Sequence, residues 1–189
     1  NKNGKVYLLC TDGVAEFDLT TQRFKTLLQG NVDAIYFNEK LYIGKREELF
    51  VYNESTGNFD LYYHLAGKDI TLSCLHLDEK KNLWMGTTSN GLYCLSGDKK
   101  ISQPVTRGNI ASIYEDSSKE LWICTWEEGL YRIKTDSTIE NFRHDPKNPN
   151  SICADFVRSC CEDNAGNLWI GTFHGLNRYE KSTGKFQLY

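Results

Sequence analysis

The most regular pattern of apolar and polar positions lies between residues 164 and 180. An Asn- and Gly-rich turn at 164–167 precedes a short apolar run at 168–170, which is followed by a Gly–Thr pair, a second turn at 174–175 and a Leu-x-x-Tyr alternation. Short apolar runs that are bounded by Asn and Gly indicate strands joined by tight turns. The segment therefore predicts a β-hairpin of two antiparallel strands.

Weaker copies of this hairpin precede it, at residues 5–18, 40–52, 82–95 and 120–133. The steps between matched positions are 35, 43, 38 and 46 residues, measured at Gly13, Glu48, Gly91, Gly129 and Gly175. A repeat of this length is typical of a four-stranded propeller blade. We therefore predict an all-β fold, a β-propeller of four-stranded antiparallel blades, with five repeats at approximately residues 1–29, 30–66, 67–106, 107–145 and 146–189.

Each of the last four repeats contains a further apolar strand before its hairpin, expected at 32–37, 71–77, 110–115 and 156–162. Apolar residues in these strands recur three apart, as at Leu72 and Leu75, whereas a single buried face requires a spacing of two. We therefore expect both faces to be covered, as in the innermost strand of a blade between two neighbours. Outer strands are expected at 23–28, 59–63, 100–105, 139–143 and 186–189.

The first repeat has no apolar strand before its hairpin at Lys5. A closed ring of five blades would then leave backbone N–H and C=O groups unpaired at the axis. We expect residues 1–189 to be an arc of a larger ring, with the missing inner strand encoded before Asn1. Such an arc exposes two blade faces, so the expected partners include the remaining blades and neighbouring domains of the same protein, and a homodimer.

Recurring Trp, Gly and Asp residues are expected to be structural. Each strand Trp stands between apolar neighbours, where a large ring packs against an adjacent blade. The glycines allow close approach of another blade or a tight turn, and the Asp that begins each turn after an inner strand forms it through hydrogen bonds. These residues are Trp84, Trp122, Trp169, Gly86, Gly171, Gly91, Gly129, Gly175, Asp78, Asp116 and Asp163.

The repeats resemble the two-component regulator propeller repeat, and the best match lies between His144 and Tyr189. It comprises His-Asp-Pro at 144–146, Asn-Pro at 148–149, Gly-Asn-Leu-Trp-Ile-Gly-Thr at 166–172 and Gly-Leu-Asn-Arg-Tyr at 175–179. The resemblance covers essentially the whole chain, with departures at Leu9, Lys45, Glu48 and Cys124. It implies a seven-bladed ring in the periplasmic sensor domain of a hybrid two-component system histidine kinase, which detects glycans or their fragments. The signal sequence, membrane anchor and kinase would then lie outside these residues.

The composition excludes several classes of protein. A hydrophobic content of 40%, an aromatic content of 13% and three prolines do not fit a disordered or collagenous chain. No apolar run approaches the roughly 18 residues of a membrane span, so no membrane contact by this segment is expected. The net charge is −3 and the Lys and Arg residues are scattered, which argues against nucleic-acid binding.

Neither the cysteines nor the histidines form a recognisable chemical motif. The seven cysteines include no Cys-x-x-Cys pair and are expected to be small apolar residues, with a disulfide through Cys153 or Cys161 as the alternative. The four histidines lie in different repeats, so no metal site and no cofactor are predicted. No catalytic residue is predicted.

The turns between the second and third strands vary most among the repeats, and function is commonly placed on such turns. Aromatic residues beside charged groups suit a sugar, which has an apolar face and a polar rim. Trp126 stands at a turn between two acidic residues, where it either contacts a ligand or lies over its own blade. The predicted ligand-binding residues are Arg46, Glu47, Trp126, Glu127, Glu128, Phe173 and His174.

We therefore predict a non-enzymatic, extracytoplasmic ligand-sensing propeller segment of a two-component sensor, whose ligand is an oligosaccharide or another small molecule. Two alternatives share the same ring. One is a binding or scaffold propeller without signalling, and the other is a propeller-fold lyase or hydrolase.

Overall fold

The computed structural model describes residues 4–66, 69–105 and 108–189, and every regular element in these ranges is a β-strand. The strands are β1 (Lys5–Cys10), β2 (Gly13–Asp18), β3 (Arg23–Gln29), β4 (Ala34–Phe37), β5 (Leu41–Lys45), β6 (Glu48–Asn53), β7 (Asn58–His64), β8 (Leu72–Leu77), β9 (Leu83–Thr87), β10 (Leu92–Leu95), β11 (Ile101–Val105), β12 (Ile110–Glu115), β13 (Leu121–Thr125), β14 (Leu130–Ile133), β15 (Ile139–Phe142), β16 (Val157–Glu162), β17 (Leu168–Thr172), β18 (Gly175–Glu180) and β19 (Lys185–Leu188).

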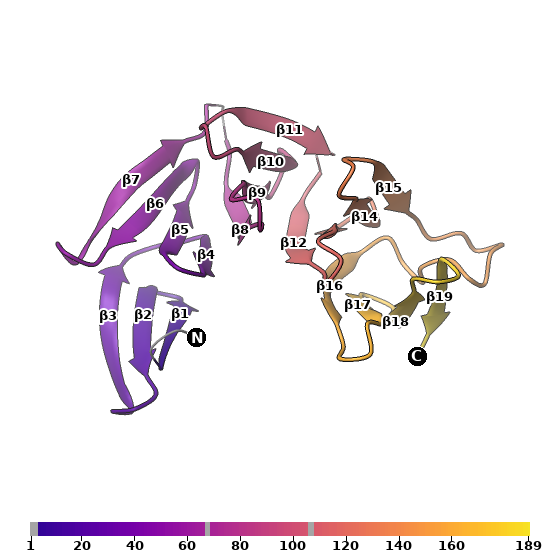
Figure 1. The fold of residues 1–189 in the computed structure, drawn as a ribbon, viewed down its shortest axis with the longest axis horizontal. Helices are drawn as coiled ribbons and strands as arrows, with labels where there is room; N and C mark the ends of the chain where they lie inside the picture. Colours follow the sequence, from indigo (N-terminus) through magenta and orange to yellow (C-terminus); the bar gives the residue numbers. More distant parts are fainter. Residues whose placement is uncertain (1–3, 67–68, 106–107) are drawn as a thin grey trace.

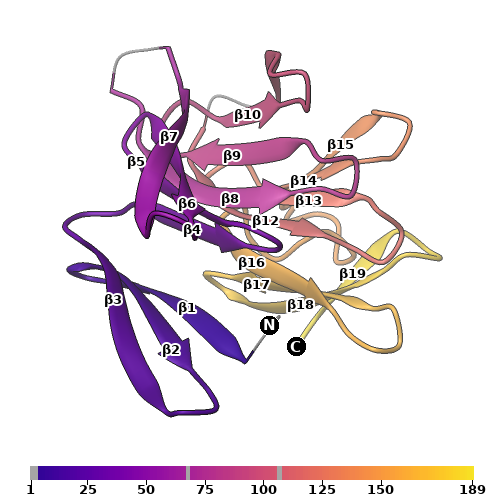
Figure 2. The same cartoon turned by 60° about the vertical axis from the view of Figure 1, so that its left-hand side comes forward.

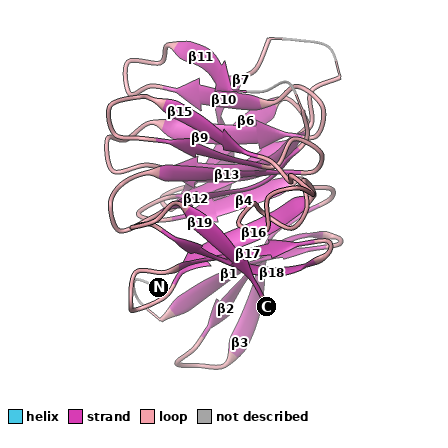
Figure 3. Cartoon of the chain, turned by 90° about the vertical axis from the view of Figure 1, so that its right-hand side faces the viewer, coloured by secondary structure: helices cyan, strands magenta, loops and turns pink. Residues whose placement is uncertain are grey.

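These strands form five antiparallel sheets, each made of consecutive strands, and we call the sheets blades one to five. The blades stand side by side in an arc, with β4, β8, β12 and β16 on its inner side and β3, β7, β11 and β15 on its outer side (Figure 1). Neighbouring sheets face one another (Figure 2), and loops gather along the two edges of the stack (Figure 3). The predicted all-β propeller architecture is confirmed.

Blade one differs from the others as the sequence predicts. Within the described residues its sheet has three strands, β1 to β3, whereas blades two to five have four each. The strand that is innermost elsewhere is therefore absent from the described part of blade one. Several strand limits differ from expectation by one or two residues, and the expected repeat boundaries near 67 and 106 fall on residues outside the described ranges.

The spacing of three in the inner strands has a different cause from the one expected. The pairing of β8 with β9 shifts between Leu72 and Cys74, so that Ser73 is an extra residue in the ladder. Equivalent shifts leave Ala111 in β12 and Arg158 in β16 as extra residues. The extra residue shifts the alternation of side chains by one position, so Leu72 and Leu75 lie on the same face of the sheet, toward blade two. The spacing of three therefore comes from the bulge and not from cover on two faces, although the expected cover is present, since Cys74 of the same strand packs in the layer toward blade four.

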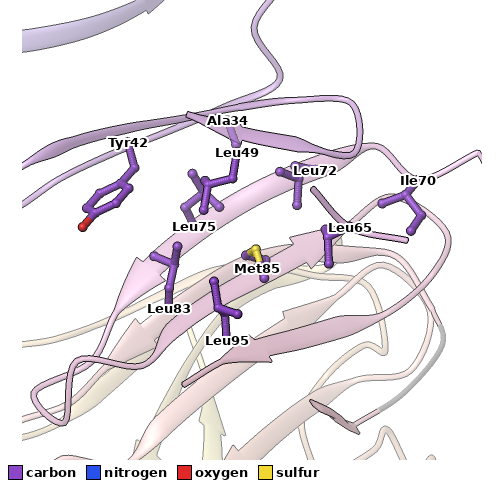
Figure 4. Packing of buried hydrophobic residues seen from close by; sticks show 10 residues of the cluster. All are labelled: Ala34, Tyr42, Leu49, Leu65, Ile70, Leu72, Leu75, Leu83, Met85 and Leu95. Atoms are coloured by element: carbon purple, nitrogen blue, oxygen red, sulfur yellow. The ribbon is translucent and has the colours of Figure 1, made fainter. Parts of the chain in front are cut away.

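The hydrophobic core consists of separate layers between neighbouring blades. The layer between blades two and three contains Leu49 of β6 together with Leu72 and Met85 of blade three (Figure 4). Trp84 lies in the layer between blades three and four, and Trp122 lies fully buried in the layer between blades four and five. Because each blade has an apolar layer on each covered side, both faces of the inner blades are apolar.

The glycines of the Gly–Thr pairs are not equivalent. A Cβ added at Gly86 would lie 2.7 Å from Cγ2 of Ile110 in the neighbouring blade and closer still to the Cys74 sulfur. At Gly171 the nearest atom would be the Ser159 hydroxyl oxygen at 3.5 Å, which is an ordinary contact. The close approach of another blade that we expected at Gly171 is therefore not present in the described structure, whereas it is present at Gly86.

Candidate functional site

The turns of each blade lie at two opposite ends, because the strands of each sheet are antiparallel. The turns between first and second strands lie at one end. The turns between second and third strands lie at the other end, together with the segments that lead from an outer strand to the next blade. All the predicted ligand-binding residues lie at this second end, which we call the mouth.

The end opposite the mouth is fixed by an Asp–Trp pair that recurs in three blades. The Trp indole Nε1 donates to the Asp at 2.8 Å in Trp84–Asp78, 2.9 Å in Trp122–Asp116 and 2.8 Å in Trp169–Asp163. Each Asp also accepts backbone N–H groups of its own turn. The hydrogen bond from Trp169, with those from Asn167, lowers the pKa of Asp163 to about 2. These acids therefore hold turns and tryptophans in place.

In blades three, four and five, the turn at the mouth is fixed by the Thr that ends the second strand. The hydroxyl groups of Thr87, Thr125 and Thr172 donate to the carbonyl oxygens of Gly91, Gly129 and Gly175 at 2.7–3.0 Å. The same hydroxyl oxygens accept backbone N–H groups from within the turns. Each turn is thus a closed hydrogen-bonded loop, which places its outermost side chains in defined positions.

A hollow of about 310 Å³ lies at the mouth between blades four and five, and we call it the aromatic hollow. Trp126 contributes to it from the β13–β14 turn, and Phe173 from the β17–β18 turn. The Phe156 and Phe173 rings are 6.3 Å apart, and the Phe173 N–H donates to the Phe156 carbonyl oxygen at 3.0 Å. Phe173 is 77% exposed and Phe156 45% exposed. The lining residues are Trp126, Phe156, Val157, Arg158, Thr172 and Phe173.

Arg158 is the single charged residue among those lining residues. It is the extra residue of the bulge in β16, and its guanidinium carbon lies 5.1 Å from the centre of the Trp126 ring. Trp126 therefore meets the inner strand of the next blade. From the sequence we expected Trp126 either to contact a ligand or to lie over its own blade, and we did not expect this contact with the next blade. A cation over an indole face is a stabilising arrangement that keeps both groups in place.

The other predicted site residues divide into two groups. His174 stands beside the aromatic hollow, with its ring 6.0 Å from that of Phe173. Glu127 follows Trp126 on the exposed turn, and Glu128 accepts a hydrogen bond from the Tyr131 hydroxyl at 2.9 Å. Arg46 and Glu47 occupy the equivalent turn of blade two and do not line the hollow. The seven predicted residues are therefore not one cluster.

Sequence reasoning missed Phe156 and Arg158 as members of the site. Arg158 lies in the inner strand β16 and Phe156 directly precedes it, and we expected this strand to be buried between blades. The signal that could have identified Arg158 is its alignment with Ser73 and Ala111, the small bulge residues of blades three and four. A long cationic side chain at a position that is elsewhere small requires space, and the mouth supplies it.

A model of the family described as Two component regulator propeller matches residues 151–174, which include Phe156, Arg158 and Phe173. No curated protein sequence matches the chain. Among solved structures, the chain is similar to the extracellular domain of BT3049 from B. thetaiotaomicron, assigned as a hybrid two component system. The identity is 23% and the TM-score 0.77, over 93% of this chain and 25% of that one.

The chain is also similar to virginiamycin B lyase from Staphylococcus aureus, with 15% identity and a TM-score of 0.79 over 100% of this chain and 67% of that one. A third similar structure is PorZ of Porphyromonas gingivalis, with 15% identity, a TM-score of 0.73, and 97% and 31% coverage. These likenesses establish the propeller fold. The chain spans about a quarter of the length of the BT3049 domain. In the described ranges, no helix has the length and apolar character needed to cross a membrane.

Proposed function

We propose that residues 1–189 belong to an extracytoplasmic propeller that binds a small ligand and reports its presence through a two-component system. The repeat at 151–174 that matches the regulator family supports this function. The likeness to the extracellular domains of BT4673 and BT3049, both assigned to two component systems, supports the same location and role. The observation that carries the proposal is the aromatic hollow, which lies within and beside the matched repeat.

The ligand class proposed for the aromatic hollow is a sugar. Exposed aromatic rings remove the apolar face of a sugar ring from water, and a few polar groups orient the rim. The volume of about 310 Å³ is near the lower end of ligand pockets, and it suits one or two sugar rings. Phe156 and Phe173 supply two ring faces, and the hydrogen-bonded turn at Thr172 fixes the position of Phe173.

Binding without chemistry fits the lining residues better than a lyase or hydrolase. The residues that line the hollow carry one guanidinium group and one hydroxyl group, but no carboxylate or imidazole. General acid–base catalysis relies most often on carboxylates and imidazoles that contact the reacting group. The fold likeness to virginiamycin B lyase therefore does not transfer that activity to this hollow. A binding propeller without signalling remains the second candidate.

A glycan array probed with residues 1–189, followed by calorimetric titration of each bound glycan, tests the proposal. Phe173→Ala should weaken binding roughly 5- to 150-fold, because a stacked aromatic side chain contributes on the order of 1–3 kcal/mol. Phe24→Ala is the matched control, since Phe24 is 68% exposed on β3 of blade one, far from the hollow. Equal effects of the two substitutions would refute the site.

The signalling part of the proposal has a separate test. The gene should be sequenced on both sides of the segment that encodes residues 1–189. A membrane-spanning segment followed by a kinase is expected. A gene that encodes neither would assign the propeller to a binding or scaffold role without signalling.

A further inference from the structure

Arg158 is placed so that its charge faces a ligand in the aromatic hollow. The guanidinium carbon lies over the Trp126 ring, 5.1 Å from the ring centre. The N–H groups of arginine point outward in the plane of the guanidinium group, so stacking on an aromatic ring leaves them free to donate hydrogen bonds. Among the described residues, no ion pair joins a carboxylate to Arg158, although six ion pairs elsewhere are shorter than 3.0 Å.

The charge of Arg158 also contrasts with its surroundings. The chain carries a net charge of −3, and the turn on the Trp126 side of the hollow adds the acidic residues Glu127 and Glu128. These acids do not line the hollow, and Glu128 is bonded to Tyr131. A neutral sugar would leave the single charge of the lining without a counterpart, whereas a carboxylate matches the guanidinium group in both charge and geometry.

We propose that the aromatic hollow takes an acidic sugar, a uronic acid residue whose carboxylate receives paired hydrogen bonds from Arg158 while its ring stacks on Phe156 and Phe173. This inference rests on the proposed sugar-binding function and specifies its ligand. Trp126 acts as a positioning residue, because its ring contacts the guanidinium group. Arg158 is the extra residue of the bulge in β16, and its side chain lines the hollow.

The test compares two oligosaccharides of equal length and linkage, one of galacturonic acid and one of galactose, by calorimetric titration at low and high salt. The acidic sugar should bind at least tenfold more tightly, and this preference should shrink as the salt concentration rises. Arg158→Gln should bring the ratio of the two affinities close to one. Arg158→Lys should retain part of the preference, because lysine keeps the charge but cannot form the paired geometry.

The outcomes separate this inference from the function on which it rests. Equal affinities for the two sugars, with binding still lost in Phe173→Ala, would overturn the acidic specificity and leave the sugar site intact. Failure of both sugars and of a whole glycan array to bind would instead refute the proposed function. A thermal melt of each variant serves as the folding control, since Arg158 is exposed and the loss of its contact with Trp126 should lower the melting temperature by only a few degrees.

A second inference comes from a cysteine pair between blades four and five. The sulfur atoms of Cys124 in β13 and Cys160 in β16 are 3.6 Å apart. Cys124 stands where blades two, three and five have glycine, at Gly44, Gly86 and Gly171. Both sulfur atoms lie within the apolar layer that contains Ile170 and Val157. No other pair of thiols is within bonding reach among the hydrogen-bonded cysteines of the described residues.

We infer that Cys124 and Cys160 form a disulfide bond when the protein matures in an oxidising compartment. The two thiols lose two electrons and two protons, and an exchanging disulfide, such as oxidised glutathione or a protein disulfide, is reduced to two thiols. A bond requires the sulfur atoms to approach from 3.6 Å to about 2.05 Å, and the two side chains would have to rotate to close this distance. The bond would join two blades that are otherwise held by packing and hydrogen bonds.

The buried position of the pair determines when the bond can form. The hydrogen bond with Cys124 and the burial of the thiol raise the pKa of Cys160 well above its usual range. The thiolate is the reactive form, so the thiols of the folded protein exchange slowly. Oxidation should therefore occur before the interface between blades four and five closes.

Refolding of residues 1–189 from urea in a glutathione redox buffer tests this inference. After refolding, five of the seven cysteines should react with a thiol reagent in denaturant, and peptide mapping without reductant should find Cys124 joined to Cys160. The oxidised form should melt on the order of 5–10 °C higher than the reduced form, and Cys124→Ser should abolish this difference. Cys94→Ser, a buried cysteine of blade three, is the control. Seven reactive thiols, or a bond between other cysteines, would overturn the inference.

Discussion

Replacement of Asp116 by alanine should destabilise the protein strongly, although Asp116 lies in a turn. Its side chain is only 2% exposed. One carboxylate oxygen accepts the Trp122 indole N–H at 2.9 Å and the Lys181 ammonium group at 2.9 Å, and the other accepts the backbone N–H groups of Ser118 and Glu120. The substitution removes the acceptor for all four donors.

The expected loss in the free energy of unfolding depends on which other acceptor each of the four donors can reach once the carboxylate is gone. The Trp122 N–H is fully buried, and an unpaired buried donor costs about 1–3 kcal/mol. Lys181 keeps its contact with Glu162 at 2.6 Å, so its share is about 1 kcal/mol. The two backbone N–H groups lie in a surface turn and can bond to water. The total is about 2–4 kcal/mol, which corresponds to a decrease in melting temperature of roughly 5–15 °C.

The same substitution in blade five provides a matched control. Asp163 makes the equivalent bond to Trp169, but Trp169 is half-buried and no lysine pairs with Asp163 in the described structure. Thermal and urea unfolding, followed by circular dichroism, should therefore show a clearly smaller loss for Asp163→Ala than for Asp116→Ala. Equal losses, or a loss below about 1 kcal/mol for Asp116→Ala, would refute the reasoning that burial of the indole N–H sets the cost.

Three further predictions concern pH, packing and the contact between blades four and five. The pKa of Asp163 is about 2 in the folded protein and about 3.9 in the unfolded chain, so its stabilisation is complete above about pH 4 and is lost as the pH falls toward 2; Asp163→Asn should flatten the melting temperature over this range. Gly86→Ala should lower the melting temperature, because overpacking reduces the free energy of unfolding by about 1–3 kcal/mol, whereas Gly171→Ala should have little effect in the same melts. Lys181→Met should destabilise less than Asp116→Ala, because it leaves the Trp acceptor in place; a larger effect in urea unfolding would contradict this order.

The sequence predicts the blades because each blade repeats the same local pattern at steps near 40 residues. It also predicts the three strands that the described residues of blade one form. The cause of the spacing at Leu72 and Leu75 could not be predicted, because a bulge is a property of pairing between two strands. An extra residue in a ladder and a strand that is covered on both faces give the same apolar spacing.

The candidate site was predictable only in part. Trp126 and Phe173 stand out because turns at the mouth carry the variable residues of a repeat. Arg46 occupies the same turn of another blade, yet it does not join them, since equivalent turns of distant blades lie apart in the arc (Figure 1). Arg158 was missed because its position as the extra residue of a bulge depends on the pairing of β16 with β17, which the sequence pattern does not show.

The layers between the blades differ in size, and this difference has a consequence for local opening. The layer that joins blades one and two has three buried apolar residues among those described, Val14, Leu41 and Ile43, whereas the next layer has ten. In a repeat array each unit is held by its neighbours alone, so the unit with the smallest interface opens at the lowest free energy. Amide protons of β1 to β3 should therefore exchange with solvent deuterium as one group, well before those of β8 or β13.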